Sequence, residues 1–269
     1  MSEARKLLVI IDPTHDVQIA LERALSKSKL LEIKPEICLL ICVDAGSANL
    51  KADNKNVYRD GAWLKSITHD LDAEGIKYSF IHCWSSQWHQ AVIHVARQFH
   101  PNNILIPDYR DDEKIFELSN EKWALFRSSA AAVTLVRPGH SAPLKKILAA
   151  VNIQKDSDPK YAKLIDKVLE ESGGIAAYYG AELHVVNSYM HISDHPTMEN
   201  VIQRTNLPAE RIHIPEGSPD NAIADCARKL EVDMVVIGTL ARDGALAFLK
   251  GNTSEKILRK VEQDVVVLS

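Results

Sequence analysis

The feature that most constrains the fold is a strand pattern that occurs near the start of the chain and again just past its middle. The stretch RKLLVIID at 5–12 and the stretch KKILAAVN at 145–152 both begin with two basic residues, continue as an apolar run and end in a polar side chain. An apolar run without alternation is typical of a strand buried on both faces of a parallel sheet. The repeat therefore indicates an internal duplication.

Both copies continue with alternating strand and helix patterns. In the first half, further strands are predicted at 37–43, 78–83, 104–106 and 133–136, with helical patterns at 16–27, 63–71 and 92–99. In the second half, strands are predicted at 183–186, 212–214, 234–237 and 265–268, with helices at 161–178, 218–230 and 252–261. Short right-handed connections place such helices on both faces of a parallel sheet. We expect an α/β protein with two doubly wound, five-stranded parallel-sheet domains in tandem, related by a pseudo-two-fold axis.

The boundary between the copies is the segment RPGHSAPL at 137–144, which has the prolines and glycine of a short linker. The chain has 269 residues, enough for two domains of the usual size of roughly 100–150 residues. We therefore expect domains at 1–139 and 145–269.

The charge and hydropathy patterns exclude several classes of protein. With 32 basic and 36 acidic residues and no basic cluster, the chain lacks the features of a nucleic-acid binder. The longest apolar runs, such as 37–43, are far shorter than the roughly 18–20 residues of a membrane-spanning helix, and the N-terminus lacks a signal-peptide pattern. We expect a cytoplasmic protein that binds neither membranes nor nucleic acid.

Residues that could suggest metal or redox chemistry favour structural roles. The cysteines lie in apolar patterns without a C-x-x-C pair, so buried free thiols are expected at Cys38, Cys42, Cys83 and Cys226. His191 and His195 are four residues apart, but the sequence between them is typical of a loop, so we expect no metal ligands. Trp84 and Trp88, with His89, are expected to pack at a strand–helix junction.

A candidate binding loop lies in the second half, at MVVIGTLARDGALAFLKGNTS, 234–254. A buried strand ends at Gly238, where a binding loop needs backbone freedom, and Gly251 precedes the start of an amphipathic helix. Asn252 is a candidate N-cap, with Glu255 three residues on. The free N–H groups at such a helix start attract anions such as phosphate.

The spacing of this loop resembles the phosphate-loop signature of the universal stress protein family. Gly238, Ala241 and Gly251-Asn252 form the pattern G-x2-A-x9-G-N, whereas the family has G-x2-G-x9-G-[ST]. The stretches IIDP at 10–13 and AAVNI at 149–153 extend the resemblance, and each half is similar to one family domain, as in the tandem bacterial type.

The resemblance implies one possible ATP site, in the C-terminal half only, with no metal beyond the magnesium that accompanies a nucleotide. In a doubly wound sheet, ligands bind beyond the carboxyl ends of the strands. The candidate binding residues are Asn152, Ser188, Gly238, Thr239, Arg242, Gly251, Asn252, Thr253 and Ser254. Asn152 stands where the family has an aspartate, and it brings hydrogen-bonding capacity without charge.

The first half lacks the glycines of this loop. The corresponding positions are Pro107, Arg110 and Asn120, and a proline offers no N–H to a phosphate. Asp12 still occupies the family's acidic position on the adenosine side. We expect this half to have lost nucleotide binding.

The function that follows is a cytosolic stress-response protein acting as a binding module for a small molecule such as a nucleotide, without catalytic residues. No G-x-S-x-G elbow and no G-x-x-x-x-G-K-[ST] loop are present, and the sequence does not identify a general base for water near 238–251, so an enzyme is disfavoured. Two alternatives stay open. In the first, the protein does not bind ATP and its cleft holds another nucleotide conjugate or an apolar ligand. In the second, the protein is a weak ATPase.

The duplication also suggests how the halves associate. Family domains commonly dimerise through their last strand, which here corresponds to 133–136 and 265–268. We expect these strands to meet antiparallel as an intramolecular pseudo-dimer, with further oligomerisation possible.

Overall fold

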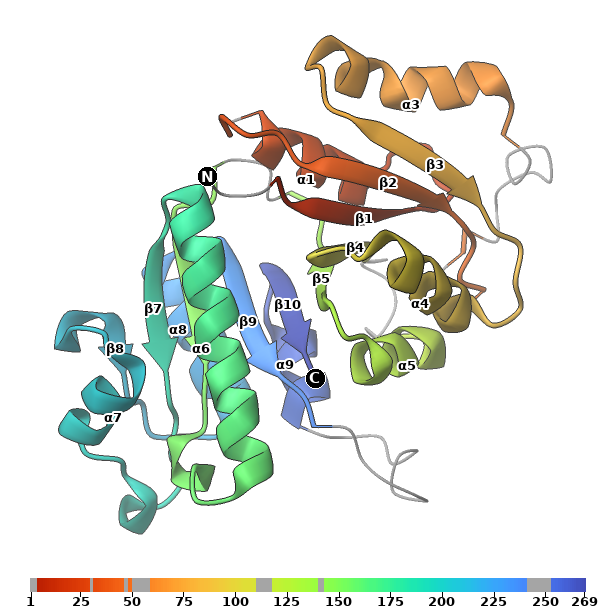
Figure 1. The fold of residues 1–269 in the computed structure, drawn as a ribbon. Helices are drawn as coiled ribbons and strands as arrows, with labels where there is room; N and C mark the ends of the chain where they lie inside the picture. Colours follow the sequence, from red (N-terminus) through yellow and green to blue (C-terminus); the bar gives the residue numbers. More distant parts are fainter. Residues whose placement is uncertain are drawn as a thin grey trace. The chain divides into compact units, whose positions relative to one another are not determined.

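The computed structural model describes residues 4–29, 31–45, 48–49, 59–109, 118–139, 143–240 and 253–269. The chain separates into two compact units, 1–143 and 144–269 (Figure 1). In the described part of the chain, no helix is both long enough and apolar enough to cross a membrane.

The first unit is built on a parallel sheet of five described strands in the order β3-β2-β1-β4-β5. The strands are β1 (Lys6–Ile11), β2 (Glu36–Ile41), β3 (Tyr78–His82), β4 (Asn103–Pro107) and β5 (Ala132–Val136). After their first residue, β1 and β2 are buried throughout, which explains their unbroken apolar sequences. The strand order reverses between β1 and β4, so the ligand position typical of such sheets lies beyond these two strands.

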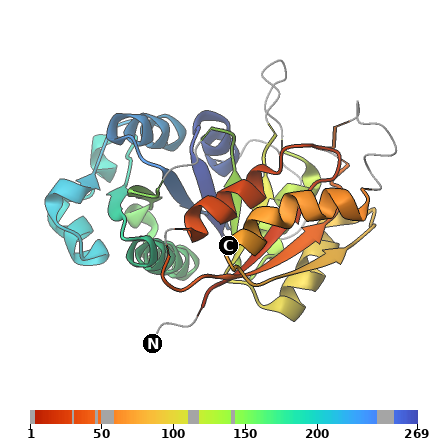
Figure 2. The same ribbon diagram turned by 90° about the horizontal axis from the view of Figure 1, so that it is seen from above.

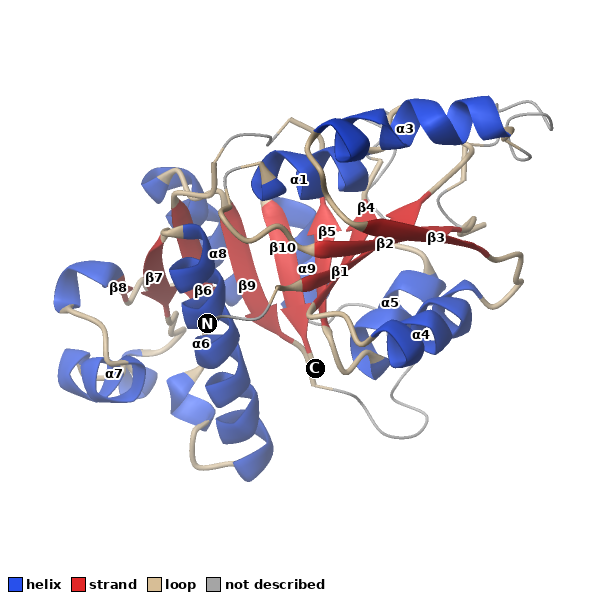
Figure 3. Cartoon of the chain, turned by 45° about the horizontal axis from the view of Figure 1, so that its top comes forward, coloured by secondary structure: helices blue, strands red, loops and turns tan. Residues whose placement is uncertain are grey.

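Helices cover both faces of this sheet. They are α1 (Ile19–Ser28), α3 (Gly61–Ala73), α4 (Trp88–Phe99) and α5 (Asn120–Ser128). Helices α1 and α3 lie side by side on one face, and α4 and α5 lie on the other (Figures 2 and 3). On the α1 side, Leu7, Val9 and Ile11 of β1 belong to one apolar cluster with Leu21 of α1 and Leu71 of α3.

Helix α1 begins three residues later than the sequence predicted. The Asp12 carboxylate accepts hydrogen bonds from the Thr14 N–H at 2.9 Å and from the Thr14 hydroxyl at 2.6 Å. The Gln18 side chain accepts from the Asp12 N–H at 3.1 Å and donates to the Asp12 carbonyl at 2.9 Å. These bonds hold 12–18 as a compact turn, because polar side chains there offer the backbone an alternative to helical hydrogen bonds.

The second unit repeats this architecture, with five described parallel strands in the order β10-β9-β6-β7-β8. The strands are β6 (Lys146–Ala150), β7 (Glu182–Val186), β8 (Ile212–His213), β9 (Met234–Gly238) and β10 (Asp264–Leu268). The helices are α6 (Pro159–Tyr179), α7 (Met198–Thr205), α8 (Pro219–Leu230) and α9 (Thr253–Lys260). The doubly wound α/β fold expected from the sequence is confirmed.

Helix α7 was not predicted. Its first turn is capped by Thr197, whose hydroxyl accepts from the Asn200 N–H at 3.2 Å, and it ends at Asn206 in the left-handed conformation. Of its apolar residues, Val201 is buried whereas Met198 and Ile202 are partly exposed. The helix therefore lacks the broad apolar stripe by which surface helices are recognised.

Some packing expectations were wrong. All four cysteines are free, and Cys38 and Cys42 are buried, but Cys83 and Cys226 are only partly buried. Trp88 packs in the interior as expected, whereas Trp84 is 55% exposed.

Candidate functional site

The second unit contains a cavity of about 500 Å³ at the carboxyl ends of its central strands. Residues at the ends of β6, β7 and β9 line it, together with residues of α6, α8 and α9. Its volume lies within the roughly 300–1,000 Å³ that is typical of small-molecule sites.

The cavity brings together the described residues that the sequence nominated. Asn152, Ser188, Gly238, Thr239, Thr253 and Ser254 all line it. The other three nominated residues, Arg242, Gly251 and Asn252, lie outside the described residues, as does Ala241.

Gly238 has a role other than the one inferred from the sequence. Its φ is not in the left-handed region, so this position does not require the backbone freedom of glycine. A Cβ built on Gly238 would lie 2.7 Å from both Cγ and Cδ2 of Leu164 on α6. The glycine therefore allows the Leu164 side chain to approach the end of β9 closely.

The polar rim of the cavity is organised by Asn187, which sequence reasoning missed. This fully buried residue accepts a hydrogen bond from the Ile153 N–H at 2.7 Å and donates to the Gln154 side chain at 3.0 Å. Gln154 in turn donates to the Ser188 carbonyl at 3.0 Å. These bonds tie the end of β6 to the end of β7 and so position Asn152 beside Ser188. The sequence does contain a sign of this role, because Asn187 is a polar residue directly after the buried run HVV.

Two features of the rim favour a negatively charged ligand group. Thr253 and Ser254 form the first turn of α9, where the helix dipole is positive. Lys160 in the first turn of α6 also lines the cavity. Helix α6 is fixed there by Asp158, whose carboxylate accepts from the Lys160 N–H at 2.9 Å.

An ion pair connects α8 and α9, the two helices that border the cavity on the β9 side. Asp220 lies 2.5 Å from Lys260, measured between Oδ2 and Nζ. Burial alone would raise the pKa of Asp220, but the hydrogen bond from Lys260 and further polar contacts hold it below its usual range. The carboxylate therefore stays charged at neutral pH and anchors α9 against α8.

The remaining wall is apolar. Buried aliphatic side chains line the cavity from the sheet and from all three helices, namely Ile165, Val168, Val186, Ile223, Ile237 and Ile257. A ligand with an apolar or aromatic part and an anionic part matches this lining.

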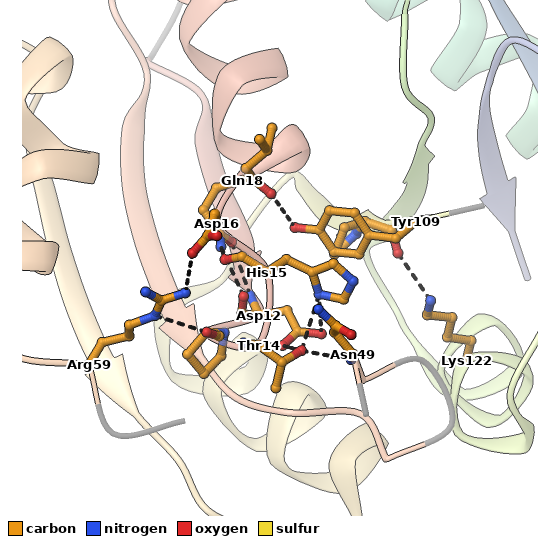
Figure 4. Close-up of polar contacts among 12 residues, drawn as sticks. Asp12, Thr14, His15, Asp16, Gln18, Asn49, Arg59, Tyr109 and Lys122 are labelled. Atoms are coloured by element: carbon orange, nitrogen blue, oxygen red, sulfur yellow. Dashed lines mark hydrogen bonds and ion pairs between the residues drawn. The ribbon is translucent and has the colours of Figure 1, made fainter. Parts of the chain in front are cut away.

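Charged side chains gather at the corresponding end of the first unit, and Asp12 and Lys122 are among those drawn in Figure 4. Asp12 directly follows β1, Asp108 directly follows β4 and Arg137 directly follows β5, and all three are buried. Asp44, just beyond β2, is also buried and accepts from the Ser119 hydroxyl at 2.7 Å. Arg137 Nε contacts Asp108 Oδ2 at 3.3 Å.

Lys122 of α5 is the cation buried among these carboxylates. It is 3% exposed, and its Nζ donates to the Pro107 carbonyl at 3.0 Å. Burial lowers the pKa of Lys122, and the nearby charges of Asp108, Asp44 and Asp12 oppose this shift. Lys122 therefore brings a buried amino group near three carboxylates, and its hydrogen bond to the Pro107 carbonyl fixes its position.

Aromatic rings cover the rest of this strand end (Figure 4). The rings of His15 and Tyr109 stack with centroids 3.6 Å apart, and His15 Nδ1 lies 3.3 Å from Asp12 Oδ2. The Tyr109 hydroxyl donates to the Val17 carbonyl at 2.9 Å. Asp12 thus has partners within its own unit at the position where the family resemblance implied an adenosine contact. Of the three positions that replace glycines, Pro107 ends β4, Asn120 begins α5 and Arg110 lies outside the described residues.

In the described part of the chain, no three His, Cys, Asp or Glu side chains are arranged to hold a metal ion. His191 and His195 flank a single 3-10 turn, Ile192–Asp194, so they do not share a helical face.

Comparison with known proteins identifies relatives of this chain. A model of the universal stress protein family matches residues 194–269. A universal stress protein E homolog from Haemophilus influenzae is 24% identical over 297 residues, covering 96% of this chain and 94% of that protein. Universal stress protein E of Escherichia coli K12 is also 24% identical, covering 100% of this chain and 95% of its own length.

By the family model over its C-terminal part and by relatives that match its whole length, the chain is similar to universal stress proteins. The crystal structure of a Pseudomonas aeruginosa UCBPP-PA14 protein named as a universal stress protein aligns with a TM-score of 0.76 and 27% identity. The alignment covers 98% of this chain and 93% of that one. Since the relatives match along the whole chain, it has the length of the tandem, two-domain members of the family.

Replacing Gly238 by Ala should lower the free energy of unfolding by about 1–3 kcal/mol, because the new methyl group overlaps Leu164. In a Leu164→Ala background the same substitution should have a smaller effect, which urea unfolding of the four proteins in a double-mutant cycle would measure. Equal losses in both backgrounds would contradict the close-approach role of Gly238.

Replacing Lys122 by Met should lower the free energy of unfolding by about 3–5 kcal/mol, because it removes one buried positive charge from the neighbourhood of three buried carboxylates. Urea unfolding at neutral pH gives the value. Lys65→Met, at an exposed position on α3, is the matched control and should change stability by less than about 0.5 kcal/mol. If both variants were equally stable, Lys122 would not hold the strand ends together.

Proposed function

We propose that this protein is a universal stress protein that acts as a non-catalytic binding module and holds one adenine nucleotide, such as ATP, in the cavity of its second unit. Magnesium would enter with the nucleotide and bind its phosphates. The first unit would bind none.

The observation that carries the proposal is the difference between the two strand ends. In the second unit, a cavity of about 500 Å³ is lined by polar groups and by the start of α9. In the first unit, the same position in the fold holds Asp12, which contacts His15 of the His15–Tyr109 stack, and Lys122, which donates to the Pro107 carbonyl. One nucleotide per chain follows from this contrast.

The parts of a nucleotide match the parts of the cavity. Phosphate groups suit the first turn of α9 and Lys160, since both bring positive charge. A base suits the aliphatic wall, and Asn152 and Ser188 offer hydrogen bonds to the base or ribose.

A second candidate is a different ligand that combines an apolar group with an anion. The aliphatic wall favours it, because Ile165, Val168 and Ile257 bring no polar atoms from their side chains to a base. ATP hydrolysis is the weakest reading, since among the described lining residues no Asp, Glu or His is present as a general base.

Calorimetric titration of the full chain with MgATP should give a stoichiometry of one per chain. Ser254→Asp should weaken binding by about tenfold, roughly 1.4 kcal/mol, because a carboxylate at the start of α9 repels phosphate while suiting the helix dipole.

The matched control is Asn120→Asp, which makes a comparable charge change at the start of α5 in the first unit and should leave the affinity unchanged. Two equal sites, or a loss of binding with Asn120→Asp, would contradict the assignment to the second unit. If ATP does not bind at all, native mass spectrometry of the purified protein would reveal the alternative ligand.

We further propose that the last strands of the two halves, β5 and β10, pair antiparallel within one chain. Leu268 accepts from the Thr239 N–H at 2.7 Å, so the adjacent Val267 N–H points away from β9 and is available to another strand.

Val267→Pro should remove this outward donor, leave the β9–β10 ladder intact and separate the halves. Sedimentation velocity should then report a larger frictional ratio, or new association between molecules. Val265→Thr is the control, since it keeps its N–H group and should sediment as the wild type. An unchanged frictional ratio for Val267→Pro would refute this pairing.

A further inference from the structure

Among the described residues, the strand β3 lies at the edge of the first unit's sheet, and no described strand pairs with its outer side. It pairs with β2 on one side, and all but its first residue are exposed. Phe80 is 49% exposed and Ile81 is 36% exposed. Their side chains point to opposite faces of the sheet, so apolar surface is exposed on both faces of the edge.

The usual protections of an edge strand are missing from this sequence. The strand YSFIH contains no Lys, Arg, Asp, Glu, Pro or Gly, whereas natural edges are commonly blocked by charges, prolines or bulges. The charged pair nearest its start, Lys77 with Glu36, lies before the strand begins.

The backbone of β3 has a defined outward side. The Ile37 N–H donates to the Lys77 carbonyl at 2.9 Å, and the Cys83 N–H donates to the Ile41 carbonyl at 3.0 Å. In a parallel ladder alternate residues face the neighbour, so Lys77, Ser79, Ile81 and Cys83 face β2. The backbone groups of Tyr78, Phe80 and His82 therefore point away from the sheet.

We propose that β3 pairs with the β3 strand of a second copy of this chain, antiparallel and centred on Phe80. In this register Phe80 lies opposite its own copy, and Tyr78 lies opposite His82 of the other chain. All three outward-facing residues then form hydrogen-bonded pairs.

The side chains suit this register. Tyr78, Phe80 and His82 share one face, and the rings of Phe80 and His82 already meet edge to face at 5.8 Å between centroids. Self-pairing would extend them into an aromatic ladder across the two strands, a favourable cross-strand arrangement. On the other face Ser79 meets Ile81, and the absence of like charges removes the usual penalty of pairing identical strands.

The test is sedimentation velocity of the full chain over a concentration series up to about 1 mM, which covers weak association. The wild type should show a concentration-dependent increase in mass toward a dimer. Phe80→Pro removes an outward N–H without touching the ladder to β2, so it should weaken self-association at least tenfold and keep the wild-type circular dichroism spectrum. Phe80→Lys, which keeps the backbone and adds a charge at the symmetric centre, should act likewise.

Two control variants make the result specific. Ile81→Pro removes an N–H that faces β2, so it should also lower thermal stability, unlike Phe80→Pro. Ile192→Lys removes a large apolar side chain of the second unit, the most exposed one in the described ranges at 81%, and should leave self-association unchanged. A wild type that stays monomeric throughout, or Phe80 variants that associate as the wild type does, would overturn the proposal.

Discussion

The structure depends on parallel strands that are buried on both faces. Such strands leave one kind of place for polar chemistry, the ends at which the buried backbone emerges from the sheet. In both units the functional candidates lie there, whether as a cavity lined by Asn152 and Ser188 or as a network around Asp12 and Lys122. The buried strands thus confine charged and polar side chains to the strand ends, and the residues that follow each strand determine which polar groups are present there.

The carboxyl ends of the central strands carry different kinds of residues in the two units. In the second unit, small and uncharged residues follow the central strands, and Gly238 lets Leu164 approach while space is left beside it. In the first unit, acidic residues follow three strands and a lysine enters from α5. Buried charges need compensation inside the protein, so side chains of opposite charge gather at this strand end.

The sheets, the duplication and the place of the candidate site could be predicted because a buried strand leaves a pattern of a few consecutive apolar residues. The continuous apolar stretches at 5–12 and 145–152 located the sheets and the duplication, and polar residues after them located the candidate site. What sequence reasoning missed depends on long-range contacts. Asn187 bonds to residues 33 and 34 positions earlier in the chain, and the lysine among the acidic strand ends comes from a distant helix. Helix α7 was missed because so little of it is buried, and the space-making role of Gly238 appears only when α6 is placed beside β9.

The ion network of the first unit has a thermodynamic consequence. A domain whose strand ends are closed by its own charges draws no stability from solutes, whereas a domain with an open cavity is stabilised in proportion to the logarithm of ligand concentration, once that exceeds the dissociation constant. Under the proposed function, the two halves of one chain would therefore respond differently to the ligand concentration. The stability of the first half would not depend on the ligand, whereas the resistance of the second half to unfolding would rise with the amount of ligand present.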